Sequence, residues 1–179
     1  MKLTKEAAYA LYTGLVTDTG RFRFDSVSSK TFQAAAKLID AGVNPAVIDN
    51  HLSVEDMATL KLKGYVLSNF VTTEGGFVYI KITRDVIEKF GVTDEEASSQ
   101  VSTISTIDGY PVWALVMEYP GNEIRIRLRS RGPIINTLAE KYNGGGHAKA
   151  AGASLENWEQ LDQFVSEAEA IAKEYLSNK

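Results

Sequence analysis

The spacing of apolar residues changes about a third of the way along the 179-residue chain. In the first third, apolar positions recur at helical spacing. From Phe77 onward, several stretches alternate apolar and polar residues with the period of a strand. The first third is therefore predicted to be helical, and the remainder to mix strands with helices. This order favours an α/β or α+β fold with a helical segment in front.

Helix caps and glycine stops divide the first third into four predicted helices. The first begins at the cap Thr4 and is broken by Gly14, and the short apolar piece Leu15-Val16 and a loop through Phe22 follow it. The others are predicted near 28–42, 44–51 and 53–67. The residues expected on the buried face of the second helix are Phe32, Ala35, Ala36 and Ile39.

Three strands are predicted in the remainder, over 77–82, 112–119 and 123–130. The first follows a Gly75-Gly76 turn and forms one arm of a hairpin, and a Pro-Gly-Asn turn joins the other two. Capping residues predict helices over 83–90, from Thr93 through Ile104, from Pro133 to about Tyr142, and from Asn157 to the C-terminus. The boundary between the helical part and the mixed part lies near residues 50 to 68.

Composition excludes several kinds of site. The chain has no cysteine and only two histidines, so it cannot build a Cys/His zinc site, a disulfide framework or a thiol nucleophile. A hard metal held by carboxylates remains open. The net charge of −4 offers no bulk attraction to nucleic acid or anionic membrane. No apolar stretch is long enough to span a membrane, and we expect a cytoplasmic protein.

Positive charge is concentrated around one predicted strand. The stretch Glu123–Ser130 alternates strictly, so its aliphatic residues enter the core while its arginines share the other face. Residues 121–150 carry four Arg and two Lys against two Glu, which leaves −8 for the rest of the chain. This asymmetry indicates a local anion site, although the strand alone also fits a solvated face that charge protects from edge pairing. The arginines on this face are Arg125, Arg127 and Arg129.

A glycine-rich segment favours the anion site. Gly144, Gly145 and Gly146 have no Cβ to obstruct a ligand, so their backbone N–H groups can point at an oxyanion. They lead into His147 and an alanine-rich run with helix-forming composition, and we expect His147 to contact the ligand at the mouth of a glycine loop. The spacing fits neither the dinucleotide-binding nor the P-loop pattern.

Asp18 is the candidate carboxylate of the helical part. It follows a short apolar piece in Thr17-Asp18-Thr19-Gly20 and is expected on a tight turn, which can present a carboxylate to a metal. By itself, the residue also fits a turn aspartate that bonds to its own backbone.

Three segments together resemble the DHH phosphoesterase superfamily. They are Leu11–Phe22 with its Thr-Asp-Thr-Gly-Arg-Phe end, Arg127–Gly132, and Gly144–Gly152 with Gly-Gly-Gly-His and Ala-Ala-Gly. Within the superfamily the chain is most similar to the bacterial bifunctional oligoribonucleases, or nanoRNases. These enzymes degrade very short RNAs and dephosphorylate 3′-phosphoadenosine 5′-phosphate. The glycine-histidine segment resembles the associated C-terminal domain, DHHA-1.

The resemblance implies a domain layout and residue roles. Residues 1–50 would be the end of the catalytic DHH domain, 51–68 a linker helix, and 69–179 a mixed-sheet α/β DHHA-1 domain that binds substrate. Asp18 would be the last of the acidic motifs that hold two manganese ions, and it would take part in catalysis with His147. The residues implied in binding substrate phosphate and nucleotide are Arg129, Ser130, Arg131, Gly144, Gly145, Gly146 and His147.

The chain departs from the family in the acidic motifs that supply the other metal ligands. It contains no Asp-x-Asp and no Asp-His pair, and Met1 stands only 17 residues before Asp18. We therefore expect the C-terminal portion of a longer enzyme, inactive by itself, whose partners are an N-terminal DHH half and short RNA or nucleoside phosphates. A homodimer stays open, as do the roles of Arg21, Arg125, Arg127 and Lys149.

Two alternative functions stay open at this point. The cyclic- or linear-dinucleotide phosphodiesterases of the same superfamily share both motifs and differ mainly in substrate. A non-catalytic RNA-binding module, similar to the domain that ends some alanyl-transfer-RNA synthetases, is the other alternative, and the Asp-Thr-Gly segment argues against it.

Overall fold

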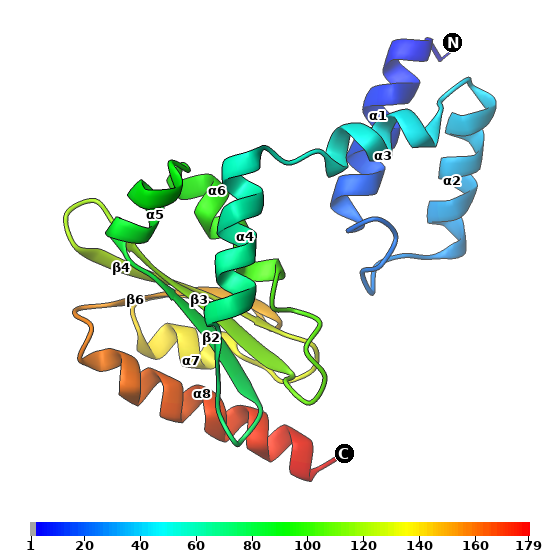
Figure 1. Cartoon of the computed structure of the whole chain (residues 1–179). Helices are drawn as coiled ribbons and strands as arrows, with labels where there is room; N and C mark the ends of the chain where they lie inside the picture. Colours follow the sequence, from blue (N-terminus) through cyan, green and yellow to red (C-terminus); the bar gives the residue numbers. More distant parts are fainter. Residues whose placement is uncertain (1–2) are drawn as a thin grey trace. The chain divides into compact units, whose positions relative to one another are not determined.

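The computed structural model describes residues 3–179, which form two compact units that divide between Glu55 and Asp56. The first unit contains three helices, α1 (Lys5–Asp18), α2 (Ser29–Asp40) and α3 (Pro45–Ser53) (Figure 1). Thr4 and Asn44 cap α1 and α3 as the sequence predicts, through side-chain oxygens that accept backbone N–H bonds. The buried residues of this small core are Ala8, Tyr12, Val16, Ala35, Leu38, Val43 and Ile48.

Two details of the first unit differ from the sequence prediction. Helix α1 continues through Gly14 to Asp18, so Leu15-Val16 is helical and not a separate piece. Tyr12 and Val16 lie four residues apart on one buried face, and their packing outweighs the roughly 1 kcal/mol that a mid-helix glycine costs. In α2, the buried residues are Ala35 and Leu38, so three of the four residues predicted on the buried face are wrong, namely Phe32, Ala36 and Ile39, which are exposed. The Phe32 ring nevertheless stacks on Phe22.

The second unit is a six-stranded mixed sheet with helices on both faces (Figure 1), as predicted for an α/β fold. Its strand order is β1-β2-β3-β4-β6-β5, in which β2 and β3 are parallel and the other neighbours antiparallel. Strands β2, β3 and β4 have the bounds that the sequence predicts. The elements are α4 (Met57–Asn69), β1 (Val71–Thr72), β2 (Phe77–Ile82), α5 (Arg84–Phe90), α6 (Asp94–Ser99), η1 (Gln100–Ser102), β3 (Val112–Tyr119), β4 (Glu123–Ser130), α7 (Asn136–Lys141), β5 (Gly145–His147), β6 (Ala150–Leu155) and α8 (Gln160–Ser177).

Alternation along the strands builds two separate cores. One face of the sheet packs against α7 and α8 through Ile124, Ile126 and Leu128 of β4 and neighbouring strand residues. The other face packs under α4, α5 and α6, but its core ends at β3. Helix α4 belongs to this core through Leu62 and Val66, which are fully buried. Within the second unit, this apolar core does not extend over the half of the face formed by β4, β6 and β5, and the arginines of β4 lie there.

The segment after the glycines is a strand, so the predicted loop and helix-forming run are wrong. Gly145–His147 forms the edge strand β5 and turns back into β6. Ala151, Ala153 and Leu155 are buried against the α7 and α8 side, while Gly152 between them is exposed. This two-residue period, satisfied by pairing with β4, overrides the helix propensity of alanine.

Four predicted helices have other bounds in the structure. The helix expected over 53–67 is α4, which begins at Met57 because Asp56 and not Ser53 caps it, and the helix expected from Asn157 begins at Gln160. The helix expected from Thr93 through Ile104 ends at Ser99 and continues as one 3-10 turn, although Val101 and Ile104 are buried as expected. The helix expected from Pro133 begins at Asn136. No helix between residues 3 and 179 is both long enough and apolar enough to cross a membrane.

The β5–β6 hairpin gives a stability prediction. A Cβ built on Gly144 would lie 1.9 Å from the Gly152 carbonyl oxygen, whereas a Cβ on Gly145 would meet nothing within 4 Å. Gly144→Ala should lower the free energy of unfolding by about 1–3 kcal/mol or more, because backbone must move to admit the methyl group. Gly145→Ala is the matched control and should be neutral or stabilising by up to about 1 kcal/mol. Urea unfolding measures both, and equal stabilities would contradict the close approach of the strands.

Candidate functional site

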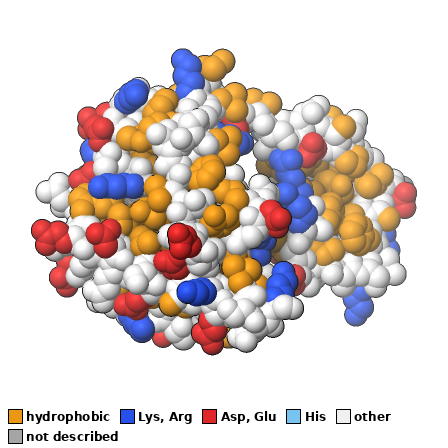
Figure 2. Space-filling view, turned by 60° about the horizontal axis from the view of Figure 1, so that its bottom comes forward, with side chains coloured by type: hydrophobic (Ala, Val, Ile, Leu, Met, Phe, Trp, Pro, Cys, Tyr) orange, Lys and Arg blue, Asp and Glu red, His pale blue; other side chains and the backbone are white. Residues whose placement is uncertain are grey.

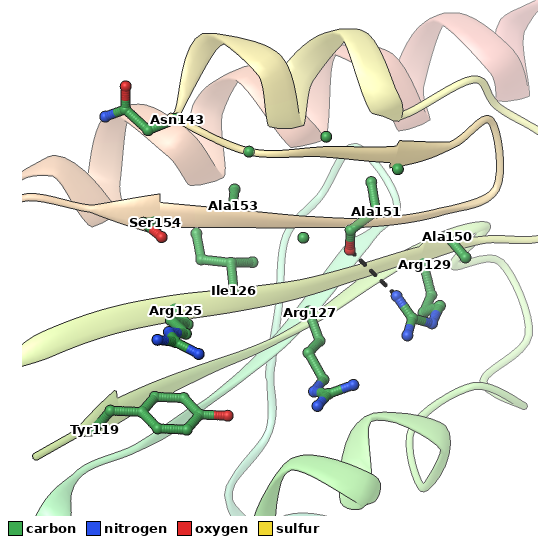
Figure 3. A pocket seen from close by; sticks show the side chains of 14 residues that line it. Tyr119, Arg125, Ile126, Arg127, Arg129, Asn143, Ala150, Ala151, Ala153 and Ser154 are labelled. Carbon is green, nitrogen blue, oxygen red and sulfur yellow. Dashed lines mark hydrogen bonds between the residues drawn. The ribbon is translucent and has the colours of Figure 1, made fainter.

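The uncovered half of the sheet carries a row of arginines, namely Arg125, Arg127 and Arg129, which we call the arginine row. All three project from the same face of β4 (Figure 3). Cross-strand pairing sets Arg127 opposite Gly152, and Gly152 in turn opposite Gly145. Paired residues point to the same side of a sheet, so two positions without side chains lie next to Arg127. Gly145 and Gly152 form what we call the glycine floor.

A cavity of about 480 Å³ lies over the arginine row and the glycine floor. Its size is within the range of small-molecule binding pockets. Among the residues that the structure describes, no aspartate or glutamate lines it. The lining residues are Tyr119, Arg125, Ile126, Arg127, Arg129, Asn143, Gly144, Gly145, Gly146, Ala150, Ala151, Gly152, Ala153 and Ser154.

The cavity cannot be recognised from the overall distribution of charge on the surface. Acidic and basic side chains are interspersed with exposed apolar ones on the face that Figure 2 shows. The net charge of the chain is −4, so the positive field of the cavity is local.

Arg125 is paired with a carboxylate. Its Nε and Nη2 donate to the two carboxylate oxygens of Glu123 at 2.8 and 2.9 Å, and its guanidinium lies 4.7 Å from the ring centre of Tyr119. The hydrogen bonds from Arg125 lower the pKa of Glu123, and those to Glu123 raise the pKa of Arg125. Arg125 therefore brings little net charge to the cavity.

Arg129 is held against the sheet. Its Nη1 donates to the carbonyl oxygens of Leu128 and Ala151 at 2.8 and 3.2 Å, and the side chain is partly buried. Burial lowers the pKa of Arg129, and the positive charge of Arg127 lowers it further. A guanidinium has five N–H donors, so Arg129 keeps donors for a ligand after these two bonds.

Three of the residues predicted to contact the ligand lie in different surroundings. His147 shares a row with Ala150 and Arg129, and therefore their face of the sheet, but it is exposed and is not among the residues lining the cavity. Ser130 is turned to the opposite face, where its buried hydroxyl donates to the Pro133 carbonyl. The Arg131 guanidinium donates to the carbonyls of residues 107 and 110. Contact of these three residues with a ligand stays a prediction.

The glycines meet a packing requirement as well as leaving space for a ligand. Gly144 donates its N–H to the Ala139 carbonyl, so this group does not point at an anion. Gly146 has φ +138°, and a Cβ there would lie 2.7 Å from the Ala150 carbonyl oxygen. Gly145 differs from both, because a Cβ on it would meet open space. Gly144 and Gly146 therefore allow β5 to approach β6, and Gly145 leaves the floor of the cavity bare.

Asp18 belongs to the first unit and is exposed at the last turn of α1. Within residues 3–179 no group of three or more His, Asp or Glu side chains is placed to hold a metal ion. Two catalytic metal ions need several such ligands, so the described residues do not fit a complete two-metal site.

The turn after Asp18 is strained and tightly held. Gly20, Arg21 and Phe22 all have φ between +55° and +61°, a costly conformation for residues other than glycine. The Arg21 guanidinium lies 3.0 Å from the Asp49 carboxylate and also donates to the Leu52 carbonyl and the Ser53 hydroxyl. Arg21 therefore ties this turn to α3.

Several lining residues were not predicted from the sequence, among them Tyr119, Asn143 and Ser154. Ser154 pairs with Arg125 and would have been placed on the correct face if β6 had been identified as a strand. Tyr119 pairs with Glu123 at the end of β3, and the predicted strands contained that information. Asn143 has φ +53° just after α7, a position where asparagine is tolerated.

The family follows from a match of residues 74–174 to the DHHA1 domain. The chain belongs to the DHHA1 domain family. The matched residues contain strands β2 to β6, the arginine row and the glycine floor. The resemblance of the glycine-histidine segment to the DHHA-1 domain is thereby confirmed.

Curated relatives align with nearly the whole chain. The bifunctional oligoribonuclease and PAP phosphatase NrnA of Bacillus subtilis is 40% identical over 97% of this chain and 55% of its own length. The protein of the same name from Thermus thermophilus is 30% identical over 96% of this chain and 52% of its own length. The chain thus spans about half the length of the curated relatives it matches.

A solved structure shares the fold. The crystal structure of an exopolyphosphatase-related protein from Bacteroides fragilis aligns with a TM-score of 0.86 and 27% sequence identity. The alignment covers 95% of this chain and 52% of that protein.

The ion pair at the rim of the cavity gives a prediction. Glu123→Gln should strengthen the binding of inorganic phosphate about two- to fivefold, because Arg125 loses its exposed partner and becomes available. The free energy of unfolding should change by less than about 1 kcal/mol. Phosphate titration monitored by NMR measures the affinity.

Glu140→Gln is the control for this experiment, because it makes the same change of charge at an exposed residue of α7 that does not line the cavity. Equal gains in the two variants, or no gain for Glu123→Gln, would contradict the assignment.

Proposed function

We propose that this chain is the substrate-binding part of a manganese-dependent phosphoesterase that hydrolyses short oligoribonucleotides and 3′-phosphoadenosine 5′-phosphate. The observation that carries the proposal is the cavity with three guanidinium groups, a bare glycine floor and no acidic lining residue, within a DHHA1 domain. Guanidinium groups match phosphate oxygens by paired hydrogen bonds. The names of the curated relatives support the choice of substrates.

The reaction needs more than this cavity. In the proposal, Arg129 and the backbone around the glycine floor orient the substrate phosphate, and His147 contacts the ligand from the rim. Asp18 contributes one carboxylate toward two manganese ions, which would activate water when bound. The remaining metal ligands would come from a DHH half, which we propose as the partner, in a cytoplasmic enzyme that also forms a homodimer.

Binding is the first test. The chain should bind a labelled diribonucleotide weakly and lose affinity as salt rises, because arginine–phosphate contacts release counterions. Arg129→Ala should weaken binding about tenfold or more, and Arg129→Lys should weaken it too, because an ammonium cannot form a bidentate fork. Lys173→Ala, an exposed change on α8, is the charge control. Equal affinities of wild type and Arg129→Ala would reject Arg129 as a contact.

Turnover is the second test. With manganese supplied, the purified chain should not release mononucleotide from RNA of two to five residues at an enzyme's rate, because one carboxylate cannot retain two dications against water. Mononucleotide release, followed by chromatography, measures this. Activity that Asp18→Ala abolishes and that survives further purification would show that the chain completes its own metal site.

A further inference from the structure

The cavity holds two positive charges that no acidic side chain compensates. Arg125 is neutralised by Glu123, and no aspartate or glutamate lines the cavity. Arg129 is held only by backbone carbonyls, which leave its charge in place. Among the described residues, the Arg127 side chain has no hydrogen bond or ion pair, and the charged group that it influences is Arg129.

Arg127 is also the arginine best placed over open space. It is exposed and extends from the middle of the row, beside the glycine floor (Figure 3). Gly152 and Gly145 present no side chain to it, and a Cβ on Gly145 would meet nothing. A ligand group can therefore lie on the floor with Arg127 and Arg129 beside it. The two arginines are two residues apart on one face, about 6–7 Å along the strand.

We propose that Arg127 and Arg129 together select a terminal phosphate monoester, which carries two negative charges, over an internal phosphodiester, which carries one. The proposal rests on the proposed function and specifies its substrate class. Arg129 is the fixed contact, because the sheet holds it, and Arg127 is the movable contact that pairs with the second charge.

Charge balance supports this choice. A terminal phosphate loses its second proton near pH 6, so at neutral pH it carries a charge of about −1.5 to −2. Such a group neutralises both guanidinium groups in a cavity where they otherwise repel one another. A phosphodiester leaves one of them uncompensated. Because no described acidic residue lines the cavity, no carboxylate there compensates the guanidinium group that a phosphodiester leaves unpaired.

The experiment compares adenosine 5′-monophosphate with its phosphate methyl ester, at about pH 8, where the monophosphate is doubly charged. Calorimetry on the full chain should show the wild type binding the monophosphate about tenfold more tightly, the usual worth of an added charge-assisted hydrogen bond. Arg127→Gln should weaken the binding of the monophosphate about tenfold and leave the affinity for the methyl ester nearly unchanged, so that the preference disappears. Within residues 3–179 the Arg127 side chain has no hydrogen-bond or ion-pair partner, so this variant should unfold at the wild-type temperature.

The control is Lys173→Gln, which also removes one positive charge, at an exposed residue of α8 that does not line the cavity, and it should keep the preference. Binding of both ligands by the wild type with equal affinity, or a full preference in Arg127→Gln, would overturn the inference and leave the proposed function standing. Binding of neither ligand by the wild type would overturn both.

Discussion

The candidate site depends on the strict alternation of β4. Ile124, Ile126 and Leu128 are buried against α7 and α8, and this burial forces the arginine row onto the opposite face. A slip of one residue in the pairing would put three guanidinium groups into the core, at a cost of several kcal/mol for each unpaired charge. Because β4 is paired on both sides, by β3 and β6, its register is fixed along its length.

The same constraint explains why the cavity is open. On the arginine face, the apolar core under α4, α5 and α6 stops at β3, because the next strands offer arginines, glycines and a serine in place of aliphatic side chains. No helix could bury that surface favourably, since each charged group would lose its water. The sheet thus provides a rigid, half-covered platform, and rigid strands hold charged groups more precisely than loops do.

In the first unit, side-chain contacts hold a strained backbone conformation. Its strained turn after Asp18 is held by Arg21, by the Thr19 hydroxyl and by the stacking of Phe22 on Phe32. Backbone strain of this kind persists only where surrounding contacts over-determine it, and it tends to occur at functional sites. The aspartate that the family resemblance marks for the metal lies directly before that turn.

Local patterns in the sequence determined much of this architecture. The bounds of β2, β3 and β4, the caps at Thr4, Asn44 and Thr93, and the shared face of the arginines all follow from alternation and from side chains close in sequence. These features are predictable because the groups that decide them lie within a few residues of one another.

Only the tertiary structure decided the rest. The alanine-rich segment after His147 became a strand because β4 offered a partner for β6, a contact between residues far apart in sequence. The different states of the three arginines also depend on distant groups, since Arg129 bonds to the carbonyl of Ala151 while Arg127 faces glycines of β5 and β6. Alternation placed these side chains on one face, but hydrogen-bond partners and burial, which come only from packing, determined which guanidinium is fixed and which is available.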